Sequence, residues 1–238
     1  MADVDFTVTD DRVAVLTMRA GENRLNPSFI AAIIGALDEI ETSTGAEALV
    51  AVSAHEKIFS NGIDLDWTSG VQEAGREDEL KAFFYDLGRL FRRVLLFPLP
   101  TTAAVNGHAF AAGAVLALTF DFRFMRSDRG YFCFPEVDLG IPFLPSALAI
   151  CGRFIPPALF HEMQLTGRRL TGLECRDHGL ARAALPRDEV TGAALDFAAR
   201  LGKKRAIVAE MKARACRGII RALEVEDRPY IESGKFHY

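Results

Sequence analysis

The sequence contains one carboxylate, Glu136, that stands in an apolar setting, Phe-Pro-Glu-Val. Burial among apolar groups raises the pKa of a carboxylate, and a raised pKa suits a general base that works near neutral pH. A glutamate that follows proline is, however, most often an exposed loop residue. Glu136 is therefore a candidate for proton transfer only if groups that stabilise a developing negative charge lie beside it.

Such groups could come from a run of small residues, Ala109 to Ala114, which leads into an apolar helix through Leu118. Small residues let another molecule approach the backbone closely, and a helix start leaves several N–H groups without partners. These donors, together with the positive end of the helix dipole, favour an anionic oxygen. Small-residue helix starts are also common packing devices, so this interpretation depends on a second backbone donor elsewhere in the chain.

The composition sets the broad class of protein. The chain has 238 residues, 50% of them hydrophobic and 25% charged, which is enough core material for one large domain with a small helical appendage. A formal net charge of −4 gives no general attraction to nucleic acid or to an anionic membrane. The cysteines are far apart and have no zinc-binding spacing, so we expect buried, reduced thiols and no metal site; they are Cys133, Cys151, Cys175 and Cys216.

The two ends of the sequence bear on the location of the protein. The N-terminal segment is acidic and lacks the pattern of a secretory signal, and no apolar run is long enough to span a membrane. The last four residues, KFHY, do not resemble a peroxisomal address. These features predict a cytoplasmic protein.

Hydrophobic periodicity predicts strands that alternate with helices, which is an α/β class. Asn26 is the expected N-cap of the first helix, with Pro27 at its first position, and residues 55–65 are expected to form a polar loop. The expected strands are residues 12–18, 48–53, 101–105, 122–126, 131–134 and 180–185. The expected helices are residues 27–40, 73–97, 115–118, 146–151, 157–166, 173–178, 188–202 and 205–225.

Three separated motifs carry a resemblance to a known family. They are Phe59-Ser-Asn-Gly-Ile-Asp-Leu65, the segment from Asn106 to Leu118 followed by Asp121, and Pro135-Glu-Val-Asp-Leu-Gly140. In this order and spacing they resemble the enoyl-CoA hydratase/isomerase (crotonase) superfamily, over nearly the whole chain. The resemblance implies a spiral of ββα units in residues 1–186, a helical region in residues 187–238, and assembly as a homotrimer or hexamer.

The resemblance also supplies the second donor. In this superfamily two backbone N–H groups hold the thioester oxygen of an acyl-CoA, and the matching residues here are Ile63 and Ala112. Two aimed amides stabilise an enolate formed next to the thioester, and removal of one such donor commonly costs about 2.7–4 kcal/mol. No separate cofactor is implied, because coenzyme A is part of the substrate.

The carboxylates then decide the reaction. Hydratases of the superfamily use two glutamates, but the position of the first is Val115 here, and only Glu136 matches the second. An aliphatic residue cannot activate water, so hydration is disfavoured. A single carboxylate can still move a proton from C2 to C4, which is Δ3-to-Δ2 enoyl-CoA isomerisation in fatty acid β-oxidation. The sequence resembles this isomerase branch.

The resemblance implies substrate-binding roles for two loops and for residues around Glu136. The coenzyme A arm is expected to contact residues 22–25 and 60–64. Asp138 is an alternative acid–base group, although a loop hydrogen bond or subunit contact suits it better, and His108 is expected to be exposed or to cap the core. The substrate-binding candidates are Glu22, Arg24, Leu25, Ser60, Asn61, Gly62, Asp64, Leu65, Val115, Pro135, Leu139 and Phe143.

Two other functions stay open at this point. One is a different enolate-forming acyl-CoA reaction, such as hydration, thioester hydrolysis or decarboxylation, because a fold does not fix a reaction. The other is a non-catalytic acyl-CoA-binding protein that keeps the fold. The two donor segments together with Glu136 argue against this non-catalytic role.

Overall fold

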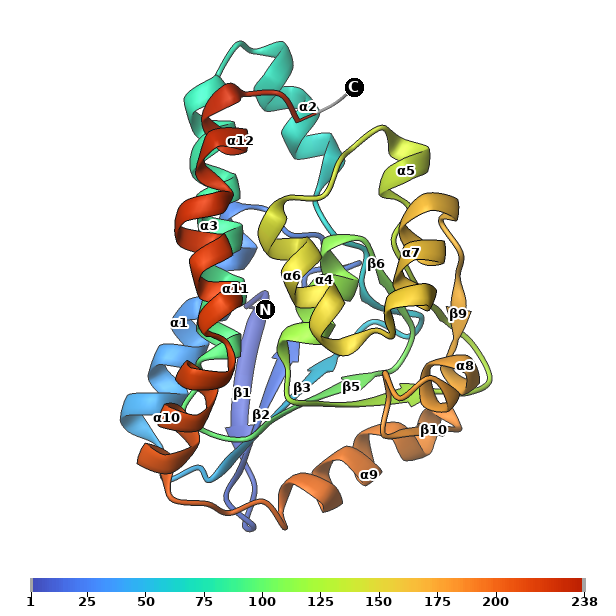
Figure 1. Ribbon diagram of the computed structural model, residues 1–238. Helices are drawn as coiled ribbons and strands as arrows, with labels where there is room; N and C mark the ends of the chain where they lie inside the picture. Colours follow the sequence, from blue (N-terminus) through green and yellow to red (C-terminus); the bar gives the residue numbers. More distant parts are fainter. Residues whose placement is uncertain (1, 237–238) are drawn as a thin grey trace.

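The computed structural model describes residues 2–236, and its frame is a six-stranded sheet (Figure 1). The strand order is β1-β2-β3-β5-β7-β10; β1 is antiparallel to β2, and all other neighbours are parallel. The strands are β1 (Val4–Val8), β2 (Val13–Met18), β3 (Ala48–Ser53), β5 (Thr101–Val105), β7 (Phe122–Arg126) and β10 (Ala183–Leu185).

A smaller sheet, in the order β4-β6-β8-β9, gives the chain a repeating path. A strand of the large sheet is followed by a strand of the small sheet and then by a helix, and this happens after β3, β5 and β7. The chain is therefore a spiral of ββα units, as expected. The small sheet contains β4 (Ile58–Ser60), β6 (His108–Phe110), β8 (Tyr131–Cys133) and β9 (Leu170–Thr171).

The two faces of the large sheet are covered by different helices. Alternate residues of a strand point to opposite faces, so Val50 packs toward α9, whereas its neighbours Leu49 and Ala51 pack into the main core. Figure 1 shows α9 along one side of the sheet, while α1, α3 and the C-terminal helices run along another side of the molecule. The helices before the C-terminal ones are α1 (Pro27–Ser43), α2 (Leu65–Glu73), α3 (Glu77–Leu95), α4 (Ala112–Thr119), α5 (Glu136–Leu139), α6 (Pro145–Phe154), α7 (Pro157–Thr166), α8 (Gly172–Asp177) and α9 (Arg187–Ala198).

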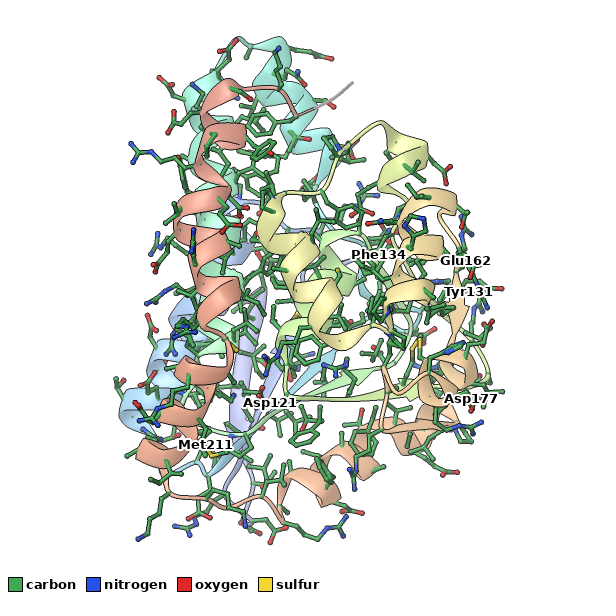
Figure 2. The ribbon with its side chains drawn as sticks, in the orientation of Figure 1. Asp121, Tyr131, Phe134, Glu162, Asp177 and Met211 are labelled. Atoms are coloured by element: carbon green, nitrogen blue, oxygen red, sulfur yellow. The ribbon has the colours of Figure 1, made fainter. Side chains whose placement is uncertain are left out.

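The C-terminal region forms a chain of short helices instead of the single helix expected over residues 205–225. They are α10 (Arg205–Ala215), α11 (Arg217–Arg221), a π-helical turn η1 (Ala222–Glu226) and α12 (Arg228–Ser233). The first of them is tied to the core, because Lys212 Nζ lies 2.6 Å from Asp121 Oδ2 and donates to Leu99 O at 2.8 Å. Figure 2 shows Asp121 in the region between the large sheet and these helices.

Most elements predicted from periodicity are present with shifts of a few residues. Asn26 caps α1 as predicted, because its side chain accepts a hydrogen bond from Phe29 N at 3.0 Å. The four cysteines are buried and free. No helix among residues 2–236 is long and apolar enough to cross a membrane. The division into two regions at residue 186 stays a prediction.

The misses are short or irregular elements. β1 was not predicted, nor was β4, which lies inside the expected polar loop, nor β6 inside the small-residue segment. The helix expected over residues 73–97 is α3, which begins only at Glu77, and α2 before it was not predicted; a turn in which Gly75 has φ +67° separates the two. Residues 136–139 form one helical turn, α5, where an irregular segment was expected.

Candidate active site

A cavity of about 220 Å³ opens between α3, the start of α4, α5 and α6. Most of its lining is apolar, and it brings together residues that are far apart in the sequence. Nine of the predicted site residues line it: Asn61, Ile63, Leu65, Ala112, Val115, Pro135, Glu136, Leu139 and Phe143. Glu22, Arg24, Leu25, Ser60, Gly62 and Asp64 lie outside the lining.

Two amides of the cavity wall are unused. Leu25 N donates to Gly62 O at 2.7 Å and Asp64 N donates to Leu25 O at 2.9 Å, so the N–H of Ile63, between them, faces the other way. Ala112 is the first residue of α4, where an N–H has no partner inside the helix. Among residues 2–236, neither the Ile63 nor the Ala112 amide donates to another protein group. Both are therefore available to an anionic oxygen.

Glycines bring these two amides together. A Cβ on Gly62, which has φ +81°, would lie 2.8 Å from the Phe110 carbonyl oxygen and 3.3 Å from the Ala112 nitrogen. A Cβ on Gly113 would lie 2.4 Å from the Ser60 carbonyl oxygen. The parallel pairing of β4 with β6 ends at this point, so the loop after β4 and the start of α4 meet with almost no space between their backbones.

Ala111, the residue before α4, has an unusual backbone conformation. Its φ of +50° and ψ of −128° lie in a region that non-glycine residues rarely adopt. Such strain persists only where the surrounding structure holds it, and it clusters at functional sites. Here it turns the chain from β6 into α4, whose first residue, Ala112, lines the cavity.

Glu136 is the first residue of α5 and projects into the same cavity. Its Oε2 atom is buried and has no hydrogen-bond partner among the described residues. Burial raises the pKa of Glu136 to about 7, against a weaker opposing effect of a backbone hydrogen bond. A half-protonated carboxylate at neutral pH can both accept and return a proton.

Aromatic side chains build the apolar surroundings of this carboxylate. Phe134, two residues before Glu136, is fully buried and lies edge-on to Phe143 and Phe160, with ring centroids 5.5 and 6.0 Å apart. Figure 2 shows Phe134 in the interior, close to α7. Val115, on α4, is 2% exposed and adds an aliphatic wall at the position that the resemblance matches to the first glutamate of hydratases.

The predicted loop residues outside the cavity support its rim. Arg24 binds Glu22 and Asp66, and Asn61 Nδ2 donates to Glu22 Oε2 at 3.1 Å. This network fixes Asn61, which does line the cavity. Because Glu22 and Arg24 are partly exposed, they are open to a ligand at the rim.

The other loop candidates act as supports. Leu25 and Ser60 are fully buried, and Ser60 Oγ donates to Asn23 O at 2.7 Å. Asp64 is the N-cap of α2, since its side chain accepts a hydrogen bond from Trp67 N at 3.3 Å. None of these three side chains faces the cavity, so any direct role in substrate binding stays a prediction.

Asp138 and His108 also lie outside the cavity lining. Asp138 is exposed, and its carboxylate packs over Gly167, where an added Cβ would lie 2.7 Å from Oδ2. His108 Nδ1 accepts a hydrogen bond from Tyr131 N at 3.2 Å, and burial lowers the pKa of this imidazole. The cavity therefore offers Glu136, and not either of these groups, as its acid–base residue near the free amides.

Sequence reasoning missed one wall of the cavity. Phe84, Leu87 and Phe91 of α3 line it and were expected only as core residues, while Ser146 and Asp227 were not considered. Asp227 lies 81 residues from Ser146 along the chain, so no local pattern could connect them. Among residues 2–236, no group of three or more His, Cys, Asp or Glu side chains is arranged to hold a metal.

Comparison with known proteins assigns the family. A family model described as enoyl-CoA hydratase/isomerase matches residues 9–233, which is nearly the whole chain. This chain belongs to the enoyl-CoA hydratase/isomerase family. Its members act on acyl-CoA thioesters, so the protein is an enzyme-family member whose small-molecule ligand class is acyl-CoA.

Similar members of the enoyl-CoA hydratase/isomerase family carry different reaction names. The peroxisomal enoyl-CoA delta isomerase 2 of Arabidopsis thaliana is 36% identical over 168 residues, covering 69% of each chain. A carnitinyl-CoA dehydratase of Salmonella arizonae is 33% identical over 196 residues, covering 79% of this chain and 70% of that one. Identity at this level shows the family and leaves the reaction to be argued from the site.

Solved structures share the fold. A crystal structure of an enoyl-CoA hydratase/isomerase family protein from Pseudomonas syringae superposes with a TM-score of 0.87 and 24% identity, covering 97% of each chain. The crotonase-like fold expected from the sequence is confirmed.

Proposed function

We propose that this protein is an enoyl-CoA isomerase that moves the double bond of a 3-enoyl-CoA to the 2-trans position. The observation that carries the proposal is a set of groups in the cavity: Glu136 with its raised pKa, the two unused amides of Ile63 and Ala112, and the aliphatic Val115 where hydratases of the superfamily have a second glutamate. The similarity to a plant enoyl-CoA delta isomerase supports the same reaction.

In the first step the thioester oxygen of the substrate accepts hydrogen bonds from the N–H groups of Ile63 and Ala112. Glu136 then removes a proton from C2. The electron pair of that C–H bond passes into the thioester, giving an enolate conjugated with the double bond between C3 and C4. The two amides stabilise the negative charge on oxygen, each by about 2.7–4 kcal/mol if it behaves like other donors of this kind.

In the second step the protonated Glu136 returns the same proton to C4. The electron pair of the C3–C4 double bond forms the new C–H bond at C4, the pair of the enolate double bond between C1 and C2 moves between C2 and C3, and the thioester carbonyl is restored. One carboxylate serves as base and then as acid, which a pKa of about 7 allows. Val115 offers no group to hold a water molecule. The enolate is therefore formed by removal of the C2 proton and not by addition of water.

The remaining assignments belong to this proposal. The acyl chain would fill the apolar cavity, and the coenzyme A arm would pass the rim at Glu22, Arg24 and Asn61. No cofactor besides the coenzyme A of the substrate is required by the reaction. The pathway would be fatty acid β-oxidation and the assembly a homotrimer or hexamer. The cytoplasmic location stays a prediction; a relative named as peroxisomal makes the peroxisome the alternative.

A second candidate is another enolate-forming reaction of an acyl-CoA, favoured by the similarity to a carnitinyl-CoA dehydratase. A hydratase or dehydratase needs a group that binds and activates water. A thioesterase or decarboxylase would act on substrates with other groups, and the cavity would have to accommodate those groups. A non-catalytic acyl-CoA-binding role is the third possibility, and the raised pKa of Glu136 argues against it.

The experiment is a panel of 3-enoyl-CoA and 2-enoyl-CoA thioesters of several chain lengths. We expect turnover of 3-enoyl-CoA to 2-trans-enoyl-CoA, with hydration of 2-enoyl-CoA far slower at every length. Comparable rates for the two reactions would show that an unrecognised group activates water. Binding of the thioesters without turnover would support the non-catalytic role instead.

A further inference from the structure

Helix α3 contains a single glycine, Gly88, and this residue lies in the wall of the cavity that holds Glu136. The other α3 residues in that wall are Phe84, Leu87 and Phe91. Positions 84, 87, 88 and 91 have the spacing of one helix face, so residue 88 lies on the face that α3 presents to the cavity. Gly88 is therefore a gap in a row of large apolar side chains.

The backbone gives no reason for a glycine at this position. Glycine inside a helix is destabilising relative to alanine. Helix α3 runs without a break from Glu77 to Leu95, and the φ of Gly88 is not positive. A Cβ added to Gly88 would lie 3.5 Å from Leu223 Cδ2, which is an ordinary van der Waals contact. Neither a turn nor a close approach of two backbones requires the glycine.

The missing side chain leaves room in the cavity. Apart from Leu223 Cδ2 and its own helix, no atom of residues 2–236 lies within 4 Å of the Cβ position at residue 88. Other parts of the protein therefore do not fill this space, and the cavity extends to it. A larger residue here would favour the helix but would shorten the cavity.

Gly88 and the candidate acid–base residue lie on different sides of this cavity. Glu136 also lines a neighbouring hollow together with Gln164 of α7, whereas Gly88 faces Leu223 of η1. Figure 1 shows α5 and α7 on one side of α4 and α6, and α3 with the C-terminal helices on the other. An acyl chain whose thioester lies beside Glu136 can therefore reach Gly88 only with its distal carbons.

We propose that Gly88 determines how long an acyl chain this protein accepts, because the space beside it holds the distal carbons of long-chain acyl-CoA ligands. The inference rests on the proposed acyl-CoA binding but not on isomerisation. Each methylene that a ligand buries strengthens its binding about fourfold. A short acyl chain that ends before Gly88 gains nothing from this space, so the effect of Gly88 depends on chain length.

The test is calorimetric binding of saturated acyl-CoA ligands of increasing chain length, beginning with butanoyl-CoA, none of which isomerisation can turn over. For the native protein we expect affinity to rise about fourfold with each methylene that the cavity buries. In Gly88→Leu the new side chain fills the space beside Leu223. This variant should bind the shortest chains with native affinity and the longest chains about tenfold or more weakly than the native protein does.

Gly88→Ala tests the same space with a change that the fold accommodates. Its Cβ makes an ordinary contact with Leu223, and alanine favours the helix, so Tm should rise by about 2–4 °C. Its affinity for the longest chains should nevertheless fall about fourfold, the effect of one methylene. Gly192→Ala is the control, because Gly192 is an exposed residue of α9 outside the cavity lining, where a Cβ meets nothing within 4 Å. It should also raise Tm, but it should keep native affinity at every chain length.

The outcomes separate this inference from the proposed function. Native affinity of Gly88→Leu for the longest chains overturns the role of Gly88, and so does an equal loss of affinity at every chain length. In either case binding of acyl-CoA by the native protein leaves the acyl-CoA proposal standing. If the native protein binds no acyl-CoA of any length, both proposals fall. If Gly88→Leu does not fold, the affinity of Gly88→Ala for the longest chains decides.

Discussion

Gly62 lies so close to the start of α4 that a Cβ added to it would meet the Ala112 nitrogen at 3.3 Å and the Phe110 carbonyl oxygen at 2.8 Å. The relationship matters because Ile63, the next residue, carries the other free amide of the cavity. The Ile63 and Ala112 amides can therefore lie close together because residue 62 has no side chain. Neither amide depends on side-chain chemistry, which is why Ile and Ala can serve at these positions.

Gly62→Ala should separate the two amides. The added methyl group must displace backbone, and φ +81° is unfavourable for alanine, so the loop carrying Ile63 has to move. We expect turnover of a 3-enoyl-CoA to fall about 10²-fold or more, as when one oxyanion donor is lost. Gly70→Ala is the control, because a Cβ there meets nothing within 4 Å, and it should keep native turnover. Native turnover in Gly62→Ala would contradict the donor assignment.

Ala111→Gly should stabilise the protein. Ala111 has φ +50°, where glycine is tolerated and alanine is strained. We expect an increase of about 1 kcal/mol in the free energy of unfolding, seen as a higher Tm. Ala31→Gly, an exposed site inside α1, should instead lose about 0.5–1 kcal/mol. A loss of stability in both variants would mean that the Ala111 methyl group makes contacts worth more than the strain.

These two sites show what the sequence can and cannot reveal. The small-residue segment and the Phe59–Leu65 motif with Gly62 were recognisable, because glycine and alanine mark places where backbones meet. The strained residue was not, since Ala111 has the same composition signal as its neighbours Ala109 and Ala112. Backbone strain is imposed by the fold around a residue and leaves no mark in the residue itself.

The sequence predicted an element well where it contained both the residues that start the element and the apolar spacing along its buried face. Asn26 and Pro27 start α1, and the apolar spacing from Phe29 to Ile40 defines its buried face. The strands β4 and β6 have three residues each, too few for a periodic pattern. Asp227 lies at the cavity only because a π-helical turn rotates it inward, and the chain must fold before Ser146 can meet it. Contacts of this kind have no local sequence signature.

Lys212→Met should destabilise the protein without changing the cavity. The variant removes the ion pair with Asp121 and the hydrogen bond to Leu99 O, and it leaves the Asp121 carboxylate without its cation. Breaking a buried pair from one side typically costs about 3–5 kcal/mol. Asp121 is 29% exposed and keeps its bonds from Thr101, so we expect the lower end of that range in urea unfolding. Arg214→Ala, in an exposed pair with Glu210, should cost about 0.5 kcal/mol or less.

The last prediction concerns the proton carrier. Glu136→Gln keeps the size and polarity of the side chain but cannot accept the C2 proton. We expect turnover of a 3-enoyl-CoA to fall about 10²-fold or more, while acyl-CoA binding is largely preserved. In the native protein kcat/KM should rise with pH and level off above about 7, because Glu136 must be ionised to act as a base.

The free energy of unfolding should change with pH in the opposite direction. The folded state holds a proton on Glu136 up to about pH 7, whereas the unfolded chain releases it near its ordinary value of 4.5, so this contribution to the free energy of unfolding declines as pH rises between the two. Glu136→Gln should lose both dependences together, and the exposed Asp138→Asn should lose neither. If Asp138→Asn abolishes turnover and Glu136→Gln does not, the acid–base group lies two residues further along the chain.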